Sequence, residues 1–149
     1  MKECAKETFL AYLRKNGLRL GREREEILDA ALDIESHFTV QDISSRLAER
    51  GLQIHRATIY RNIPVLIESG IIGSLLVYKP GSQHVQVAYE HTFGHKHHDH
   101  LVCAKCQKIL EIHHPPLERE QTKLCAKYKF TPIRHRLVVE GYCSSCRES

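Results

Sequence analysis

Hydrophobic residues in the first seventy positions recur every three to four residues, which is the spacing of amphipathic helices. The apolar positions of the first segment are Cys4, Phe9, Leu10 and Leu13, and those of the second are Ile27, Leu28, Ala31 and Leu32. The first set predicts a helix that ends near Asn16 and Gly17. The second set predicts a helix over residues 22–33.

A third and a fourth helix follow from the same periodicity and from their end signals. Thr39 precedes an apolar run and Asp42 lies three residues on, which resembles a capping box with aspartate in place of glutamate. The fourth helix is expected from Ala57 to a stop at residues 69–70. Pro64 lies inside it and removes the hydrogen bond to the carbonyl of Tyr60, which predicts a bend or an early end of the regular helix.

Two segments rich in strand-forming residues, 71–78 and 84–89, come next and flank a Pro80-Gly81 pair. Pro-Gly is typical of a type II turn, so the two segments are expected to form a hairpin. Three helices, a fourth helix after a turn, and a hairpin predict a winged helix-turn-helix. The fourth helix lies where the recognition helix of that motif is placed.

The pattern changes after residue 90. It predicts strands over residues 99–103, 108–113 and 133–142, with a helix opening at residues 115–116, where proline is acceptable in a first turn. The chain is therefore expected to be an α+β protein. A winged-helix domain over residues 1–90 would precede a small α/β domain over residues 91–149, with the boundary near residues 89–94.

Composition sharpens this division. Lys and Arg number 22 and Asp and Glu 18, so the net charge of +4 permits nucleic acid as a partner without demonstrating it. No run of 18 apolar residues predicts a membrane span, and the N-terminus lacks the apolar stretch of a secretion signal, so a cytoplasmic location is expected. Of 11 His and 6 Cys, nine His and five Cys lie at or beyond residue 80, which indicates a metal-binding second half.

Four of the cysteines form two CxxC pairs, Cys103 with Cys106 and Cys143 with Cys146. Two such pairs complete a closed tetrahedral Zn²⁺ site, whose role is structural because no coordination position is left open. A redox pair or incidental thiols are the alternatives, although a reducing cytoplasm disfavours disulfides. Cys4 and Cys125 lie outside any pair and are expected to be ordinary buried or partly buried thiols.

The second chemical motif is the segment His95-Lys96-His97-His98-Asp99-His100. If it leads into a strand, His98 and His100 point to one side and His97 and Asp99 to the other, so one segment could serve two ions. Candidate partners elsewhere are Glu90, Glu111, His113, Glu118 and His135. Mixed imidazole and carboxylate ligands suit iron(II), manganese(II) and zinc(II). Glu118 alone could instead be a carboxylate favoured by the helix dipole.

Several motifs together resemble those of the ferric uptake regulator family. They are Ala57-Thr58-Ile59-Tyr60-Arg61, Tyr89-Glu90-His91, the run from His97 to Cys106, and the terminal pair Cys143 and Cys146. The resemblance covers nearly the whole chain in the right order. It implies a dimeric, metal-responsive transcription factor with an N-terminal winged helix and a C-terminal dimerisation domain.

The resemblance also implies four sets of site residues. The structural zinc ligands are Cys103, Cys106, Cys143 and Cys146; the regulatory metal ligands are His37, Glu90, His98, His100 and Glu111; the ligands of an additional metal are His97, Asp99, Glu118 and His135; and the DNA contacts are Arg19, Tyr60 and Arg61. The polar edge of the fourth helix adds Arg56 and Thr58 to the expected DNA contacts. The chain departs from the family pattern at Gly21, Glu23 and Pro64. One extra residue between Glu90 and His98 leaves His91 or His95 as substitute regulatory ligands.

His37 gives this scheme its switch. It lies in the expected DNA-binding half, whereas the other regulatory ligands lie at or beyond the domain boundary, so an ion bound by all of them joins the two domains. The expected protein is a homodimeric repressor of metal-uptake genes that binds double-stranded operator DNA. Its regulatory ion is expected to be Fe²⁺, with Mn²⁺ or Zn²⁺ as alternatives.

Other members of the family sense zinc, manganese or peroxide. Peroxide sensors typically carry Asp where this chain has Glu111, and zinc sensors often use a Cys that this site lacks. A dinuclear zinc hydrolase is a remote alternative, because residues 95–100 fit the pattern HxHxDH. A metal-storage module is another, although the polar edge of the fourth helix argues against it. The expectation is therefore a regulator with no enzymatic activity, membrane attachment or small-molecule substrate.

Overall fold

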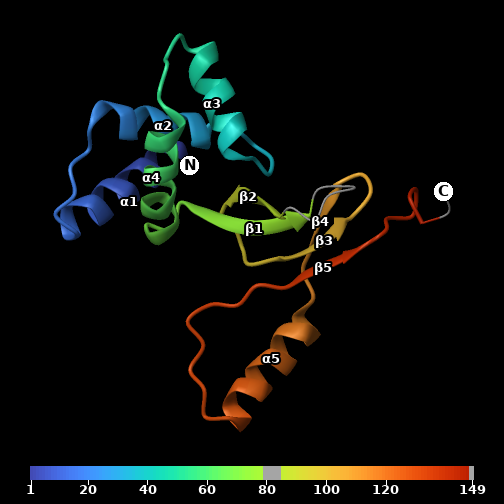
Figure 1. Cartoon of the computed structure of the whole chain (residues 1–149). Helices are drawn as coiled ribbons and strands as arrows, with labels where there is room; N and C mark the ends of the chain where they lie inside the picture. Colours follow the sequence, from blue (N-terminus) through green and yellow to red (C-terminus); the bar gives the residue numbers. More distant parts are fainter. Residues whose placement is uncertain (79–84, 148–149) are drawn as a thin grey trace. The chain divides into compact units, whose positions relative to one another are not determined.

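A computed structural model describes residues 1–78 and 85–147 of the chain. These residues form five helices and five strands, which confirms the α+β class (Figure 1). By their internal contacts the residues fall into two units. The first comprises Met1–Leu76 and Val87–His95, and the second comprises the described residues within 77–86 and 96–149. The turn predicted at Pro80 and Gly81 lies outside the described residues.

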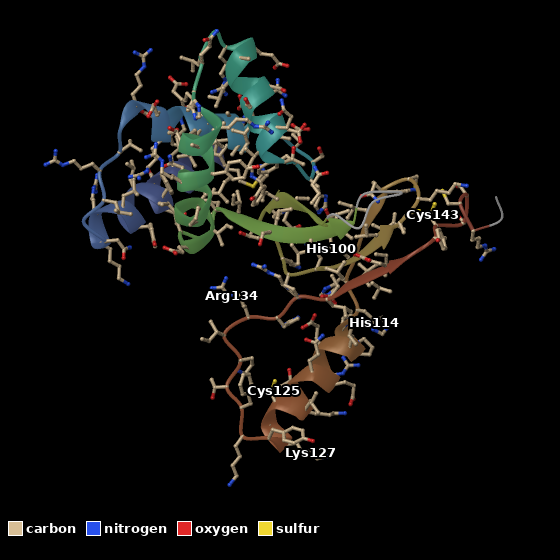
Figure 2. All side chains as sticks on the ribbon, viewed as in Figure 1. His100, His114, Cys125, Lys127, Arg134 and Cys143 are labelled. Atoms are coloured by element: carbon tan, nitrogen blue, oxygen red, sulfur yellow. The ribbon has the colours of Figure 1, made fainter. Side chains whose placement is uncertain are left out.

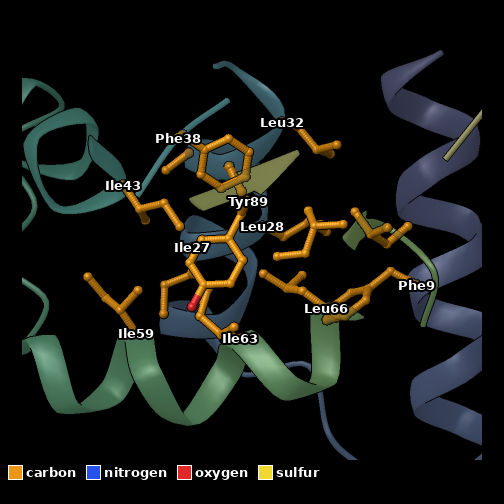
Figure 3. Close-up of a cluster of buried hydrophobic side chains, with 14 of the residues drawn as sticks. Phe9, Ile27, Leu28, Leu32, Phe38, Ile43, Ile59, Ile63, Leu66 and Tyr89 are labelled. Carbon is orange, nitrogen blue, oxygen red and sulfur yellow. The ribbon is translucent and has the colours of Figure 1, made fainter. Parts of the chain in front are cut away.

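Four helices make up most of the first unit: α1 (Lys2–Lys15), α2 (Arg22–Leu32), α3 (Val40–Glu49) and α4 (Arg56–Glu68). Their apolar faces meet in one core, in which Figure 3 shows Phe9, Ile27 and Leu66. The buried positions of α1 are Ala5, Phe9 and Leu13, each four residues after the last. The prediction that Cys4 belongs to this face is wrong, because Ala5 fills that place and Cys4 is exposed.

Signals at the helix ends are largely as predicted. Thr39 and Asp42 form the capping box of α3, in which Asp42 Oδ2 accepts a hydrogen bond of 2.7 Å from the Thr39 N–H. α4 runs without interruption to Glu68, so the early end expected at Pro64 is wrong. Proline inside a helix costs about 3 kcal/mol. Ile63 and Leu66 are buried on either side of it and each stabilises the helix by about 1.5–3 kcal/mol, which offsets that loss.

The hairpin consists of β1 (Ile72–Tyr78) and β2 (Val85–His91), which form a two-stranded sheet. An isolated antiparallel bridge joins Phe38 to Tyr89 of β2. The Phe38 N–H donates to the Tyr89 carbonyl at 2.9 Å, and the Tyr89 N–H donates back at 2.6 Å. The segment between α2 and α3 is therefore fixed to the end of β2.

The second unit contains a three-stranded sheet with β3 (Asp99–Cys103) in the middle. β3 runs antiparallel to β4 (Ile109–Ile112), with His100 opposite Glu111, and parallel to β5 (Val138–Gly141), with Cys103 opposite Gly141. β5 is shorter than the predicted strand over residues 133–142. Its pairing with β3 runs from Val138 opposite His100 to Gly141 opposite Cys103, and the His100 N–H also donates to the Leu137 carbonyl at 3.1 Å. Ile133, at the start of the predicted strand, is 93% exposed.

α5 (Pro115–Lys127) follows β4, and Figure 1 shows the chain returning from its end to β5. None of the residues of α5 is buried. Leu124 on the helix is 57% exposed, and Tyr128 and Phe130 just after it are 69% and 65% exposed. The described helices include none whose length and apolar character would let it cross a membrane.

Candidate metal centres and DNA-binding helix

The four paired cysteines converge in the second unit. Their sulfur atoms all lie within 4.8 Å of one another, and Cys106 Sγ is 3.7 Å from Cys143 Sγ. Zinc–sulfur bonds of about 2.3 Å in a tetrahedron separate the sulfurs by about 3.8 Å. The four-cysteine arrangement thus has the ligand type, number and spacing for one Zn²⁺.

Local backbone geometry prepares this site. The Gln107 N–H donates to the Cys103 carbonyl at 2.9 Å, and Gln107 adopts a positive φ of 61°, which turns the chain tightly after Cys106. Backbone N–H groups of Cys106 and then Cys143 donate to the Cys103 sulfur and lower its thiol pKa to about 6. The hydrogen bond with Cys143, followed by burial, raises the pKa of Cys146 to about 12. A cation among them favours the thiolate form of all four.

A second cluster in the same unit gathers His97, Asp99, Glu118 and His135, whose candidate ligand atoms all lie within 4.8 Å of one another. His97 Nε2 is 3.4 Å from oxygens of both Asp99 and Glu118. His135 Nε2 is 3.1 Å from Glu118 Oε2, and the two imidazole rings meet edge to face at 4.2 Å between centroids. The ligands therefore come from the start of β3, the first turn of α5 and the segment before β5.

Asp99 is the member that most clearly fits a cation. Its side chain is 1% exposed, and Oδ1, the oxygen 3.4 Å from His97 Nε2, accepts no hydrogen bond from the described residues. An unsatisfied buried carboxylate oxygen is unfavourable, and it gains its missing interaction if a metal ion is bound. Two imidazoles and two carboxylates suit a divalent ion of the zinc, iron or manganese type.

The second unit also brings together three of the predicted regulatory ligands, His98, His100 and Glu111. Glu111 lies opposite His100 across the β3–β4 ladder, and its Oε2 is 3.8 Å from His98 Nε2. The rings of His98 and His100 are 4.9 Å apart. Figure 2 labels His100 on β3. The alternation predicted for residues 97–100 is thus present, with His98 and His100 in one group and His97 and Asp99 in the other.

The first unit holds the other two predicted regulatory ligands side by side. His37 Nε2 lies 3.4 Å from Glu90 Oε2, and each side chain is 16% exposed. The bridge from Phe38 to Tyr89 brings the two residues together. Gly73 lies beside this pair, and a Cβ there would come within 2.9 Å of Thr92 Cγ2 and 3.4 Å of Glu90 Oε1.

His91 and His95, the predicted substitutes, have different surroundings. His91 Nε2 is hydrogen-bonded to the carbonyls of Ala31 and Ile34 at 3.0 and 2.9 Å. His95 is exposed in a turn in which its N–H donates to the Thr92 carbonyl. His113, another predicted ligand, is exposed and belongs to none of the clusters of candidate metal ligands among the described residues.

The predicted DNA contacts lie on α4 and on the segment before α2. Arg56, Tyr60 and Arg61 are exposed on α4, whereas Ile59 faces the core. Arg61 Nη2 donates to Thr58 Oγ1 at 3.1 Å, so these two polar groups lie on one edge of the helix. Arg19 is exposed in the connection between α1 and α2. The helix therefore has the polar outer face that groove binding requires.

Sequence reasoning missed a residue that links these elements. The Arg24 guanidinium donates to Asn62 Oδ1 on α4 at 2.7 Å and to the backbone carbonyl of Arg19. Asn62 is only 7% exposed and donates in turn to the Thr58 carbonyl. A buried asparagine within an apolar helix face is the signal that could have found this link, because such a group requires a partner.

These features define a metal-binding protein with one sulfur site, separate imidazole–carboxylate sites and a helix with a polar outer face. The sequence matches the Ferric uptake regulator family over residues 15–140. It is 32% identical over 139 residues to the ferric uptake regulation protein of Neisseria meningitidis, covering 93% of this chain and 92% of that protein.

Two solved structures are similar over most of the chain. The Helicobacter pylori ferric uptake regulator, described as having three functional metal binding sites, superposes with a TM-score of 0.80 at 26% identity and covers 100% of this chain and 95% of its own. The iron-containing regulator of Francisella tularensis gives a TM-score of 0.69 at 32% identity, covering 88% and 96%. The chain therefore belongs to the ferric uptake regulator family.

Membership settles the general class. Proteins of this family are transcription regulators rather than enzymes, which leaves the hydrolase alternative without support. The chain is a metal-binding regulator with a DNA-binding function.

Proposed function

We propose that this protein is a homodimeric repressor that binds operator DNA when a divalent metal ion, Fe²⁺ in the first place, occupies its regulatory site. The observation that carries the proposal is the pairing of His37 with Glu90 at 3.4 Å in the first unit. A nitrogen and an oxygen ligand are thereby brought together on the unit that carries α4. The remaining ligands would be His98, His100 and Glu111 of the second unit.

Ligand chemistry supports iron over softer ions. The proposed regulatory set contains only imidazole and carboxylate groups, whereas the cysteines gather in a separate site. Imidazole and carboxylate ligands suit Fe²⁺, Mn²⁺ and Zn²⁺, and thiolates favour Zn²⁺ or Cu⁺. The relatives in Neisseria meningitidis and Francisella tularensis are named for ferric uptake, and the latter structure contains iron. Metal-uptake genes are the targets that such a sensor would repress.

The other two metal sites have distinct proposed roles. Cys103, Cys106, Cys143 and Cys146 would hold a structural Zn²⁺ that ties the end of β3 to the chain after β5. His97, Asp99, Glu118 and His135 would hold an additional divalent ion, which connects β3 with α5. Both ions would stabilise the fold of the second unit, because an ion that binds only the folded state shifts the folding equilibrium.

DNA recognition is assigned to α4 and to Arg19, in a winged-helix arrangement. Tyr60 is 55% exposed and lies beside Arg61, so both side chains are available to bases and phosphates. The dimer is assigned to the second unit, where α5 has no buried residue and exposes Leu124. An amphipathic helix that has no buried residue among those described favours burial against a second copy.

The metal switch follows from differential binding. If the metal ion binds ligands of both units at once, it selects the arrangement in which those ligands converge. Its effect on DNA affinity then equals its difference in affinity between that arrangement and the others. Without the ion, the two recognition helices of a dimer need not match successive major grooves.

The test begins with an operator selected from a random double-stranded DNA library by the iron-loaded protein under anaerobic conditions. Binding to this operator is then measured against free Fe²⁺, Mn²⁺, Zn²⁺ and Ni²⁺, with the metal content of each sample determined. We expect Fe²⁺ to be the ion that supports tight operator binding at the free metal concentrations that a cell supplies. Binding that is unaffected by removing every ion except the four-cysteine zinc would refute metal control.

Two variants separate the parts of the proposal. His37→Ala is expected to abolish metal-dependent operator binding while leaving zinc content unchanged, and His114→Ala, which removes an exposed histidine at the start of α5, serves as its control. Arg61→Ala is expected to lower operator affinity at every metal concentration. If His37→Ala retained full metal dependence, the proposed link between the units would be wrong.

A further inference from the structure

His91 forms contacts that set it apart from the histidines assigned to metal sites. It is the last residue of β2 and directly follows Glu90. Its Nε2 lies 3.0 Å from the carbonyl of Ala31, in the last turn of α2, and 2.9 Å from the carbonyl of Ile34, two residues after that helix. Its ring meets the Phe38 ring edge to face, with centroids 5.7 Å apart.

The acceptors determine the state of this imidazole. Carbonyl oxygens only accept hydrogen bonds, so Nε2 must carry a hydrogen and share it between Ala31 and Ile34. A nitrogen that carries a hydrogen has no lone pair for a metal ion. His91 therefore cannot bind a metal through Nε2 without giving up both carbonyls, and His91 belongs to none of the clusters of candidate metal ligands among the described residues.

These contacts fix the segment that carries His37 at two points. On its N-terminal side, the Ile34 carbonyl is held by His91. On its C-terminal side, Phe38 is held by the backbone bridge to Tyr89 and by the edge contact with the His91 ring. His37 lies between these points, and Glu90 lies between the two β2 residues that provide them.

We infer that His91 is a positioning residue for the regulatory metal, holding His37 in reach of Glu90 rather than binding the ion itself. The inference rests on the proposed regulatory role of His37 and Glu90. It resolves the choice left open by the extra residue between Glu90 and His98, because it assigns His91 to the support of the ligands. Groups that orient metal ligands in this way typically alter metal affinity by about 10–100-fold when they are replaced.

Two variants distinguish support from ligation. Gln places an amide N–H close to where Nε2 lies, so His91→Gln keeps a donor for the carbonyls but removes the imidazole. His91→Leu removes the donor as well. The readout is the free Mn²⁺ concentration that gives half-maximal operator binding by the zinc-loaded protein, together with the urea midpoint of unfolding.

A positioning role predicts that His91→Leu raises the Mn²⁺ midpoint by about 10–100-fold, whereas His91→Gln stays within a few-fold of the wild type. If both variants lose Mn²⁺ response equally, His91 is a ligand and the inference is overturned. If His91→Leu lowers only the urea midpoint, the residue is merely structural and the inference is again overturned. A wild-type protein whose operator binding ignores Mn²⁺ and Fe²⁺ would instead refute the proposed function.

A measurement on the unaltered chain guards against a variant that fails to fold. Nuclear magnetic resonance of ¹⁵N-labelled histidine side chains, with the diamagnetic ion Zn²⁺ filling the metal sites, reports which ring nitrogen carries hydrogen. We expect His91 Nε2 to carry hydrogen both with and without the added ion. A His91 resonance that changes to a metal-bound nitrogen on addition of Zn²⁺ would overturn the inference.

Discussion

Replacement of Asp99 by asparagine tests the additional metal site, because its effect on stability should depend on the metal. Asp99 is 1% exposed and its Oδ1 lacks a hydrogen-bond partner in the described part of the chain. Asp99→Asn preserves the shape of the side chain but removes the negative charge. It therefore weakens a metal ion's hold on the site and also removes an unfavourable buried charge from the metal-free protein.

The two effects have different sizes and opposite signs. Asparagine keeps a buried polar group but not its charge, and an unsatisfied buried group costs more when it is charged. The metal-free variant is therefore expected to be more stable than the wild type by at most about 3 kcal/mol, and not less stable. A metal ion at one hundred times its dissociation constant stabilises the wild type by about 2.7 kcal/mol. The variant should lose most of that gain.

The assay is urea unfolding of zinc-loaded wild type and variant, with and without added Mn²⁺. The metal-linked increment in the free energy of unfolding is compared between the two proteins, so that contributions from the other sites cancel. Glu120→Gln is the matched control, because it removes the same charge from a side chain of α5 that is 67% exposed. Its metal-linked increment should equal that of the wild type.

One result would refute the reasoning about Asp99. If Asp99→Asn lowered the free energy of unfolding by the same amount with and without Mn²⁺, its carboxylate would be a structural group that gains nothing from a cation. Retention of the full Mn²⁺ increment by the variant would likewise show that Asp99 is not a ligand.

Three further predictions concern single contacts. Cys106→Ser is expected to abolish zinc binding and unfold the second unit, as measured by metal content and circular dichroism. The control variant Cys125→Ser should retain one zinc per chain. Equal zinc content in the two variants would contradict the four-cysteine site. Thr39→Ala removes the side-chain half of the α3 capping box and should lower the free energy of unfolding by about 1 kcal/mol, with Thr39→Ser close to wild type; no change in urea unfolding would show that the cap contributes nothing. The hydrogen bond from Lys2, and then that from Arg50, lowers the pKa of the Asp33 carboxyl. The stabilisation that the ionised Asp33 gives the folded state is therefore present above the pKa of the unfolded carboxyl and is lost as pH falls through the folded pKa. Asp33→Asn should reduce the free energy of unfolding near pH 7 by less than about 1 kcal/mol and leave it unchanged near pH 2.

Much of the first unit could be predicted because its signals are local. Thr39 and Asp42 predict the start of α3, because the cap that they form depends only on neighbouring residues. The burial of Phe9 and Leu13 on one face of α1 follows from helical spacing alone. Pro64 misled the prediction because its effect depends on tertiary burial of Ile63, which the local sequence does not reveal.

The end of the second unit could not be predicted in the same way. The residues from Ile133 onward alternate like a strand, but a strand forms only where another strand provides hydrogen-bond partners. β3 provides them from His100 to Cys103, so β5 begins only at Val138. The length of β5 is thus determined by a segment more than thirty positions earlier in the sequence.

The candidate sites show the same division. The spacing of the paired cysteines predicts the cluster that they form, and alternation along residues 97–100 predicts the two groups into which these candidate ligands fall. His91 is hydrogen-bonded to a backbone carbonyl sixty positions away. Because every residue has such a carbonyl, the sequence does not show which of them will be the partner. The bond from Arg24 to Asn62 is similarly invisible until α2 and α4 are packed together.

β3 places members of three proposed ligand sets within five residues, Asp99, His100 and Cys103. Successive strand residues face opposite sides, so insertion or deletion of one residue between the histidines and Cys103 would exchange the ligands on the two faces. Such a change would alter two metal sites at once, whereas a change of two residues would preserve the faces. Only even changes in the length of this segment preserve the two faces, so relatives should differ in length here by even numbers of residues or not at all.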